Sequence, residues 1–139
     1  MKVISEYLNL STKGGIDIIN ITDKIASILK KSKLKNGIVN ISSMGSTAGI
    51  TTCEDEPGLL SDLKDVVEKL IPRHKGYQHD RTLDNGNAHS HLRSSLVGST
   101  LAVPFVNAEL KLGTWQQIVF IEFDNRPRQR KIALQFLGE

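Results

Sequence analysis

Apolar and polar positions follow two recognisable patterns in the first part of the chain. Residues 3–10 partly alternate and are typical of a strand that ends at the turn signal Lys13-Gly14-Gly15. Apolar residues then recur at helical spacing over 18–29, with Asn20 and Thr22 as candidate N-caps. The sequence therefore opens with a predicted strand and a predicted helix.

The middle of the chain changes character twice. Asn36-Gly37 is a stop signal for the first helix, and the mostly apolar run 38–42 behind it predicts a short buried strand. Residues 42–57 are rich in Ser, Thr, Gly and acidic residues without helical periodicity, which predicts a loop. Pro57 suits a first helical residue, and the leucines and valines of 59–70 form the apolar stripe of a second helix.

The second half begins with a polar stretch and ends in strands. Residues 73–98 hold all four histidines and predict loops with a short helix over 91–97. Gly113-Thr114 is a candidate hairpin turn, and Pro104 indicates an edge strand or a bulge. The predicted strands are 101–106, 109–112, 115–123 and 128–137. We expect one α+β domain over residues 1–139, a mainly antiparallel sheet with two longer helices packed on it.

Composition and charge narrow the functional classes. The net charge is +3, from lysines at 30–35 and arginines at 126, 128 and 130. The lysines either complement the dipole of the predicted helix or attract anions. The arginines lie at every second position, so in a strand they would form one charged face. Aromatic residues make up 5% of the chain, too few for base stacking beside these cations, so we expect no nucleic-acid partner.

The sequence also bears on the compartment. Apolar runs such as 118–121 are far shorter than the ~20 residues that cross a bilayer, so we expect no membrane partner. Glu6 and Asn9 interrupt any apolar core of a signal peptide. Cys53 is the single cysteine, which excludes an intrachain disulfide. We expect a cytoplasmic protein.

The densest cluster of reactive side chains lies in residues 79–91. In an extended segment His89 and His91 would point to the same side, and His79 could join them across the Asn85-Gly86 turn. Three neutral imidazoles suit Zn²⁺ or another divalent transition metal. A phosphate or substrate pocket that uses the same histidines and an ordinary surface loop are the alternatives.

A second candidate segment follows the predicted strand 38–42. Its small and hydroxylated residues, Ser46 and Thr47 among them, would let the backbone and hydroxyl groups approach an anion, although the segment taken alone favours a flexible turn. No Gly-Lys-Ser/Thr ends the segment, so it is not a P-loop. Glu54 follows directly, whereas Asp55 and Glu56 suit the N-terminus of the next helix.

These residues together resemble the YjbQ family. The matching blocks are Gly45 to Ile50 with Glu54 and Gly58 to Leu63, then His79 with residues 84–92, Ser95-Leu96 and Gly98-Ser99, and finally residues 112–118 with Glu122, Asp124 and Pro127-Arg128. The family pattern commonly has asparagine where this chain has Cys53. The resemblance implies an α+β domain that assembles as a homotrimer with sites near subunit boundaries.

The resemblance also implies a reaction, the joining of hydroxymethylpyrimidine pyrophosphate to a thiazole phosphate with release of thiamine phosphate and pyrophosphate. Such a reaction needs bound phosphates, a neutralised leaving group and an aligned thiazole nitrogen. We expect Glu54, Asp84 and His79 as catalytic groups, with a divalent ion, Mg²⁺ or Zn²⁺. Phosphate contacts are expected from Ser46, Thr47, Arg81 and Asn87, and metal contacts from His79, His89 and His91. The alternatives are a metal-dependent hydrolase that uses the histidines and a non-enzymatic trimer that binds a phosphorylated metabolite or a protein partner.

Overall fold

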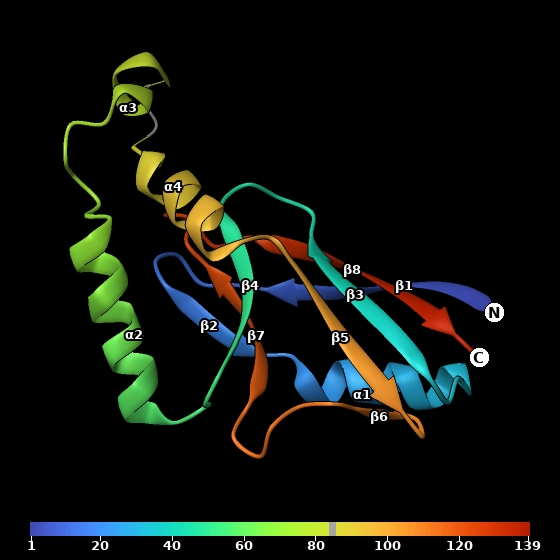
Figure 1. Cartoon of the computed structure of the whole chain (residues 1–139). Coiled ribbons are helices and arrows are strands. Elements are labelled where there is room, and N and C mark those ends of the chain that lie inside the picture. The colour runs from blue at the N-terminus through green and yellow to red at the C-terminus, as the bar shows by residue number, and fades with distance from the viewer. Residues whose placement is uncertain (84–85) are drawn as a thin grey trace.

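The computed structural model describes residues 1–83 and 86–139, and Figure 1 shows their arrangement. The strands in this part of the chain are β1 Lys2–Ser11, β2 Asp17–Asn20, β3 Gly37–Ser43, β4 Ala48–Cys53, β5 Thr100–Val106, β6 Glu109–Leu110, β7 Gln117–Glu122 and β8 Gln129–Gly138. The helices are α1 Thr22–Ser32, α2 Pro57–Leu70, α3 Gln78–Leu83 and α4 Ala88–Val97. The α+β class and the antiparallel sheet that the sequence predicts are confirmed.

The strands form two sheets in which all assigned neighbours are antiparallel. The larger sheet has the order β1-β8-β3-β5-β6, and the smaller has the order β2-β7-β4. β1 and β8 pair over their whole length, from Lys2 with Gly138 to Ser11 with Gln129. Both chain termini therefore lie at the same end of the larger sheet (Figure 1).

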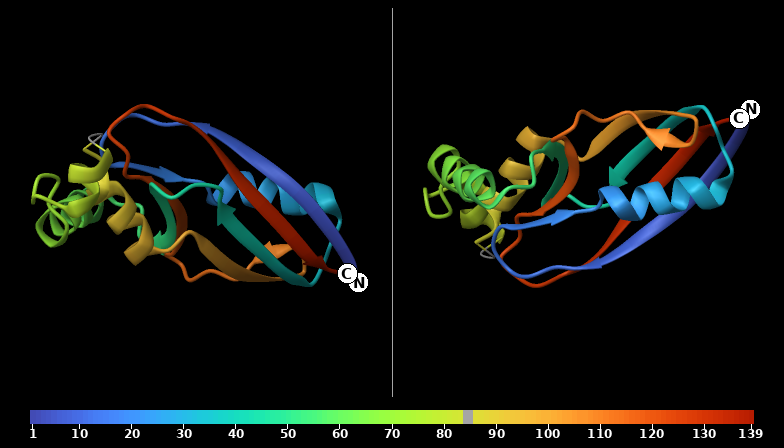
Figure 2. Two further views of the ribbon diagram at one scale, coloured as in Figure 1. Left: turned by 90° about the horizontal axis from the view of Figure 1, so that it is seen from above. Right: turned by 90° about the horizontal axis from the view of Figure 1, so that it is seen from below.

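The main core lies between one face of the larger sheet, helix α1 and one face of the smaller sheet. α1 lies across the larger sheet on one side, as the view from below in Figure 2 shows. Its Ile25 and Leu29 are completely buried, as are Phe105, Phe120 and Phe136 from the sheets. The apolar alternation in the strands and the apolar stripe of α1 bury the same core.

Helix α1 starts later than its apolar periodicity suggests. Residues 17–20 of the predicted helix form strand β2, because they pair with β7 in the smaller sheet. The Asn20 side chain accepts a hydrogen bond from the Thr22 amide at 3.0 Å, so Asn20 caps the helix from just outside it. The helix ends at Ser32, where Lys33 adopts a left-handed conformation, ahead of the predicted stop.

The predicted second helix is confirmed as α2, but it covers the sheet only lightly. The Glu56 side chain caps it by accepting hydrogen bonds from the Gly58 and Leu59 amides. None of its residues is fully buried. Leu63 and Val67 are half-buried against Val119, Ile121 and Phe123 on the second face of the smaller sheet. α2 thus lies at the side of the molecule, next to β2 and β4 (Figure 1).

Two sequence predictions about β structure are wrong. The segment predicted as a loop contains strand β4, which pairs with β7 from Ala48 opposite Glu122 to Cys53 opposite Gln117. The hairpin predicted at Gly113-Thr114 does not form, because β6 and β7 belong to different sheets. A hairpin joins β5 and β6 instead, through Asn107 and Ala108, which both have positive φ angles.

The expectation for Pro104 agrees with the structure. Among the described residues β6 pairs with Phe105 and Val106, so Pro104 lies just outside the part of β5 that has a strand on both sides. No helix in residues 1–83 and 86–139 is long and apolar enough to cross a membrane.

Candidate functional site

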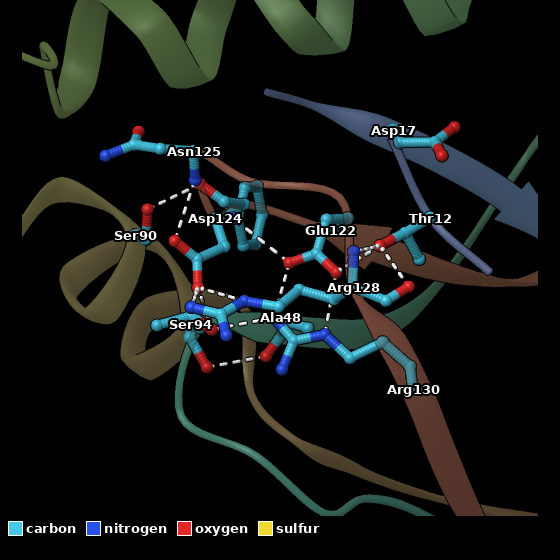
Figure 3. A network of polar contacts seen from close by, with 12 residues as sticks. Thr12, Asp17, Ala48, Ser90, Ser94, Glu122, Asp124, Asn125, Arg128 and Arg130 are labelled. Carbon is cyan, nitrogen blue, oxygen red and sulfur yellow. Dashed lines mark hydrogen bonds and ion pairs between the residues drawn. The ribbon is translucent and has the colours of Figure 1, made fainter. Parts of the chain in front are cut away.

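A buried network of charged side chains lies where β7 ends and β8 begins (Figure 3). Its base is Glu122, which is completely buried. β7 is the central strand of the smaller sheet, and its two faces pack into two different core clusters, so Glu122 is carried into the interior with its apolar neighbours. A buried carboxylate is stable only when it is paired and hydrogen-bonded, and the surrounding contacts meet this requirement.

Glu122 binds Arg130 through both of its carboxylate oxygens. Arg130 Nε donates to Glu122 Oε2 at 2.7 Å, and Nη2 donates to Oε1. Thr12 Oγ1 donates to Oε2 at 2.7 Å, and the Asp124 amide donates to Oε1 at 3.0 Å. The hydrogen bond to Glu122 raises the pKa of Arg130, although burial opposes it. The two side chains are therefore fixed in a bidentate geometry.

Asp124 forms the second half of the network. Thr47 Oγ1 and Arg128 Nε donate to Asp124 Oδ2 at 3.2 and 3.0 Å, and the Asn125 amide donates to Oδ1 at 2.7 Å. Burial raises the pKa of Asp124, but these hydrogen bonds outweigh burial and hold the pKa below its usual value. Arg130 Nη2 also donates to Thr47 Oγ1 at 2.7 Å. Thr47 thus links the two ion pairs into one network.

A small cavity of about 110 Å³ opens beside Asp124. Its lining residues are Asn87, Asp124, Asn125, Arg126 and Arg128. Asn87 precedes α4, and Asn125 Nδ2 donates to the Gly86 carbonyl at 3.0 Å, which ties the start of α4 to the loop after β7. Two arginines against one aspartate leave the lining with one excess positive charge. The cavity therefore suits an anionic group that accepts hydrogen bonds.

Helix α4 is held against this network by polar contacts. Ser90 Oγ donates to the Phe123 carbonyl, and Ser94 Oγ donates to the Ala48 carbonyl. Arg93 is 2% exposed and donates to the Ile71 carbonyl through Nε and Nη2. Its Nη2 also lies 3.0 Å from Glu68 Oε2 on α2. The polar face of α4 is thus its buried face.

The structure places the predicted metal ligands on two helices. His89 and His91 do not lie in an extended segment, as predicted, but in α4, where residues two apart point in different directions. His89 is 2% exposed, whereas His91 is half-buried and its ring centroid lies 4.9 Å from that of His79 on α3. Among the residues that the structure describes, no group of three His, Cys, Asp or Glu side chains could hold a metal ion.

The environment of His89 favours its neutral form. Burial lowers the pKa of His89, and the nearby cations of Arg93 and Arg73 lower it further, while Asp80 and Glu68 act in the opposite direction. Its Nδ1 is buried and has no hydrogen-bond partner among the described residues, and its Nε2 lies 3.3 Å from Ser90 Oγ. His89 is therefore an interior residue of α4.

The predicted phosphate contacts separate into two groups. Thr47 and Asn87 come together around Asp124, the first by a hydrogen bond and the second across the cavity. Ser46 is exposed in the loop before β4, and Arg81 is exposed on α3. Asp84, a predicted catalytic residue, lies outside the described residues.

Glu54 lies in a different cleft. This cleft of about 400 Å³ is lined by Asn20, Glu54, Asp55, Glu56, Thr114, Trp115 and Gln117. Glu54 precedes α2 and the histidines follow it, and a helix of 14 residues spans about 21 Å. Within one chain, Glu54 precedes the first residue of α2, whereas α3 and α4, which carry the histidines, lie towards the other end of α2 (Figure 1).

The sequence predictions of site residues omit Glu122, Asp124, Arg128 and Arg130. Two signals in the sequence could have found them. Glu122 is a carboxylate inside the apolar run 118–123, and Arg128 and Arg130 alternate with polar residues at the start of a strand. In the structure Arg130 lies on the inward face of β8 together with Ile132 and Leu134, so this face is not simply a charged surface.

Comparison with known proteins connects the site to a family. Residues 6–139 match the family model described as UPF0047 protein YjbQ-like. A UPF0047 protein of Methanothermobacter thermautotrophicus is 40% identical over 139 residues, with 100% of this chain and 95% of that protein covered. The UPF0047 protein YugU of Bacillus subtilis is 33% identical over 134 residues, which cover 94% of this chain and 97% of YugU.

Solved structures agree with this relationship. A crystal structure from Sulfolobus solfataricus, described as a YbjQ-like protein of unknown function, superposes with a TM-score of 0.94 at 33% identity and 99% coverage of both chains. A conserved hypothetical protein from Thermus thermophilus gives a TM-score of 0.79 at 33% identity, with 94% of this chain and 99% of that chain covered. The sequence and the fold together show that this chain belongs to the YjbQ-like UPF0047 family.

Proposed function

We propose that this protein binds the phosphate group of a small metabolite in the cavity beside Asp124. The observation that carries the proposal is the position of Arg128. Buried Asp124 holds the Arg128 guanidinium through Nε at 3.0 Å and Nη2 at 2.7 Å, at the wall of the cavity. An arginine that is fixed before the ligand arrives loses little side-chain entropy on binding.

The size of the cavity limits what it could hold. At about 110 Å³ it is well below the ~300 Å³ at which pockets for whole small molecules begin. It would take one charged group, while the remainder of the metabolite lies outside. The amides of Asn87 and Asn125 and the guanidinium of Arg126 would supply further donors.

The carboxylate of Asp124 does not argue against an anion. Its oxygens already accept hydrogen bonds from Thr47, Arg128 and the Asn125 amide, and Arg128 balances its charge. Arg126 is exposed and lines the cavity, so it contributes the excess positive charge. Guanidinium groups and amide donors bind phosphate through the same charge-assisted hydrogen bonds with which they bind a carboxylate. The attraction to a phosphate is stronger because it carries up to two negative charges.

The thiamine-phosphate synthase reaction is the catalytic form of this proposal, because both of its substrates carry phosphate groups. The thiazole nitrogen would attack the methylene carbon of the pyrimidine substrate as the bond from this carbon to the pyrophosphate oxygen breaks. Mg²⁺ would enter with the pyrophosphate as part of the substrate. Homotrimeric assembly, which the family resemblance implies, is also part of the proposal.

A metal-dependent hydrolase is the second candidate, and the ring contact between His79 and His91 favours it. Two imidazoles at this separation could contribute to a Zn²⁺ site, but no group of three His, Cys, Asp or Glu side chains among the described residues could hold a metal ion. The residues described here therefore do not fit a complete zinc site, and no step of the proposed function depends on zinc.

Calorimetric titration tests the proposal with phosphate, pyrophosphate with Mg²⁺, thiazole phosphate and thiamine phosphate. We expect at least one of them to bind the wild type, and Arg128→Gln to weaken binding by about 10- to 100-fold, because a hydrogen bond to a charged group contributes about 1.5–3 kcal/mol. Arg126→Gln should weaken binding without affecting the network.

Lys64→Gln is the matched control, because Lys64 is exposed on α2 and its loss lowers the net charge equally. If Lys64→Gln weakens ligand binding as much as Arg126→Gln does, the loss of affinity comes from the lower net charge of the protein and not from a contact in the cavity. If none of the four ligands binds the wild type, the proposed function is wrong. Zinc found near one equivalent per chain after purification without chelators would favour the hydrolase instead.

A further inference from the structure

The two carboxylate oxygens of Asp124 are occupied unequally. Oδ2 accepts from Thr47 Oγ1 at 3.2 Å and from Arg128 Nε and Nη2 at 3.0 and 2.7 Å. Oδ1 accepts one hydrogen bond from the residues that the structure describes, from the Asn125 amide at 2.7 Å. The two oxygens point apart, one towards Arg128 and the other towards Asn125 (Figure 3). Each oxygen of a carboxylate can accept about two hydrogen bonds, so Oδ1 has room for one further donor.

The environment of Asp124 keeps its carboxylate ionised at neutral pH. Burial raises its pKa, but the hydrogen bonds from the Asn125 amide, Arg128 and Thr47 hold the pKa below its usual value. An ionised carboxylate accepts hydrogen bonds and has no proton to donate. Asp124 is 2% exposed and lines the cavity. A ligand group that packs against Oδ1 must therefore bring its own donor.

The other residues that line the cavity offer donors. Arg126 and Arg128 carry guanidinium groups that only donate, and the side-chain amides of Asn87 and Asn125 carry donors too. A ligand thus needs acceptors for most of the wall and one donor for Asp124. A phosphate group that carries a proton has both, whereas sulfate has the same tetrahedral shape and, at neutral pH, only acceptors. Two arginines and one aspartate also balance a single negative charge better than two.

We propose that Asp124 makes this cavity selective for a phosphate group that carries a proton, whose O–H donates to Asp124 Oδ1. The inference rests on the proposed function and narrows its ligand to inorganic phosphate or the singly ionised form of a phosphate monoester. Sulfate or a doubly ionised monoester would place an unprotonated oxygen against Oδ1. Two negatively charged acceptors would then face each other at a buried group with no hydrogen between them.

The charged groups near Asp124, among the described residues, are one carboxylate and three guanidinium groups: Glu122, Arg126, Arg128 and Arg130. Arginine keeps its proton in proteins, and Glu122 is bound by Arg130 through both oxygens. Helix α4 approaches the site through the neutral hydroxyl of Ser90, next to His89. His89 is therefore the protein group whose titration near neutral pH needs a control.

Calorimetric titration at pH 7 with inorganic phosphate and with sulfate measures the selectivity directly. We expect the wild type to bind phosphate about 10- to 100-fold more tightly than sulfate, the range for one hydrogen bond to a charged group. Asp124→Asn should remove most of this preference, because its amide NH₂ group can donate to either anion. Arg126→Gln is the matched control. It removes a donor that serves both anions, so both affinities should fall and the preference should remain.

The pH dependence of ester binding is a second measurement, and it needs no variant of Asp124. The second pKa of a phosphate monoester is about 6, so its singly ionised fraction rises from about 3% at pH 7.5 to about 76% at pH 5.5. We expect thiazole phosphate or thiamine phosphate, whichever binds, to bind the wild type roughly 20-fold more tightly at pH 5.5. His89→Gln should show the same rise, because the proton that matters is on the ligand.

Circular dichroism at each pH establishes that every variant is folded. Equal affinities of the wild type for phosphate and sulfate, or ester binding that is no tighter at pH 5.5, would overturn the inference and leave the proposed function in place. A preference for phosphate that survives in folded Asp124→Asn would also overturn it. If neither phosphate nor the esters bind, the inference fails, and the titration with pyrophosphate and Mg²⁺ decides whether the proposed function fails with it.

Discussion

The pair formed by Glu122 and Arg130 allows a quantitative prediction. Glu122→Gln keeps the shape of the side chain but removes its charge and replaces one acceptor oxygen with a donor. Arg130 is only 14% exposed at its side chain and would lose its counter-charge. Thr12 Oγ1 and the Asp124 amide would compete for the remaining oxygen. The change therefore leaves a buried cation uncompensated and buried donors without acceptors.

The expected cost follows from these contacts. Removing one partner of a buried ion pair costs about 3–5 kcal/mol. The entropy of unfolding scales to about 0.29 kcal/mol/K for 139 residues. The Tm should accordingly fall by about 10–17 °C. Differential scanning calorimetry of the wild type and Glu122→Gln at neutral pH measures this shift.

Glu68→Gln is the matched control for this prediction. Glu68 also pairs with a buried arginine, Arg93, but its side chain is 54% exposed. An exposed partner is screened by water, and we expect a cost of under about 1 kcal/mol. Equal shifts for Glu68→Gln and Glu122→Gln would show that burial of the pair does not set its strength.

A double variant separates the charge from the packing. Glu122→Leu with Arg130→Met replaces the pair by apolar side chains, and such replacements are often close to neutral. We expect the double variant to lose less stability than the two single variants together. Additive losses, or a Tm shift below about 3 °C for Glu122→Gln, would refute the reasoning.

Two further predictions concern the histidines. His89→Ala should lose about 2 kcal/mol or more of unfolding free energy and His91→Ala clearly less, because His89 is 2% exposed and His91 half-buried; equal denaturant midpoints for both variants would contradict this. The lowered pKa of His89 predicts that its contribution to stability is complete above the unfolded pKa of about 6.5 and is lost as the pH falls through its folded pKa. The wild type should therefore lose stability between pH 7.5 and 5.5, above the range in which Asp124 titrates, and His89→Gln should lose less. Denaturant midpoints measured across this pH range test the prediction. A wild-type midpoint that stays constant, or one that falls equally in His89→Gln, would show that the buried histidine is not the cause.

The sequence by itself determined those elements whose apolar positions face the core. β1, β3, β5 and β8 follow from runs or alternation of apolar residues, and the stripes of α1 and α2 follow from helical spacing. Local signals also identified Pro57 as a first helical residue and Asn20 as a cap. These predictions succeed because the hydrophobic effect acts on each element separately and leaves its period in the sequence.

The tertiary structure decided the elements that are held by polar contacts. β4 contains Gly49 and two threonines and forms because β7 offers it a partner, so its own residues carry little strand signal. α4 buries a polar face, with Ser90, Arg93 and Ser94 bonded to carbonyl groups of distant segments. The sequence predicts a helix only over 91–97, because an apolar period cannot reveal a first turn that is buried by hydrogen bonds.

The candidate site was decided in the same way. The sequence identified Thr47 and Asn87, which lie next to turn signals, and it included Glu122, Asp124 and Arg128 only as parts of a family resemblance. Strand pairing places Glu122 opposite Ala48, next to Thr47, and the pairing of β8 with β1 brings Arg130 to the same point. Which carboxylate meets which guanidinium depends on this register between strands that lie far apart in the chain, because hydrogen bonds and ion pairs act only over a few ångströms.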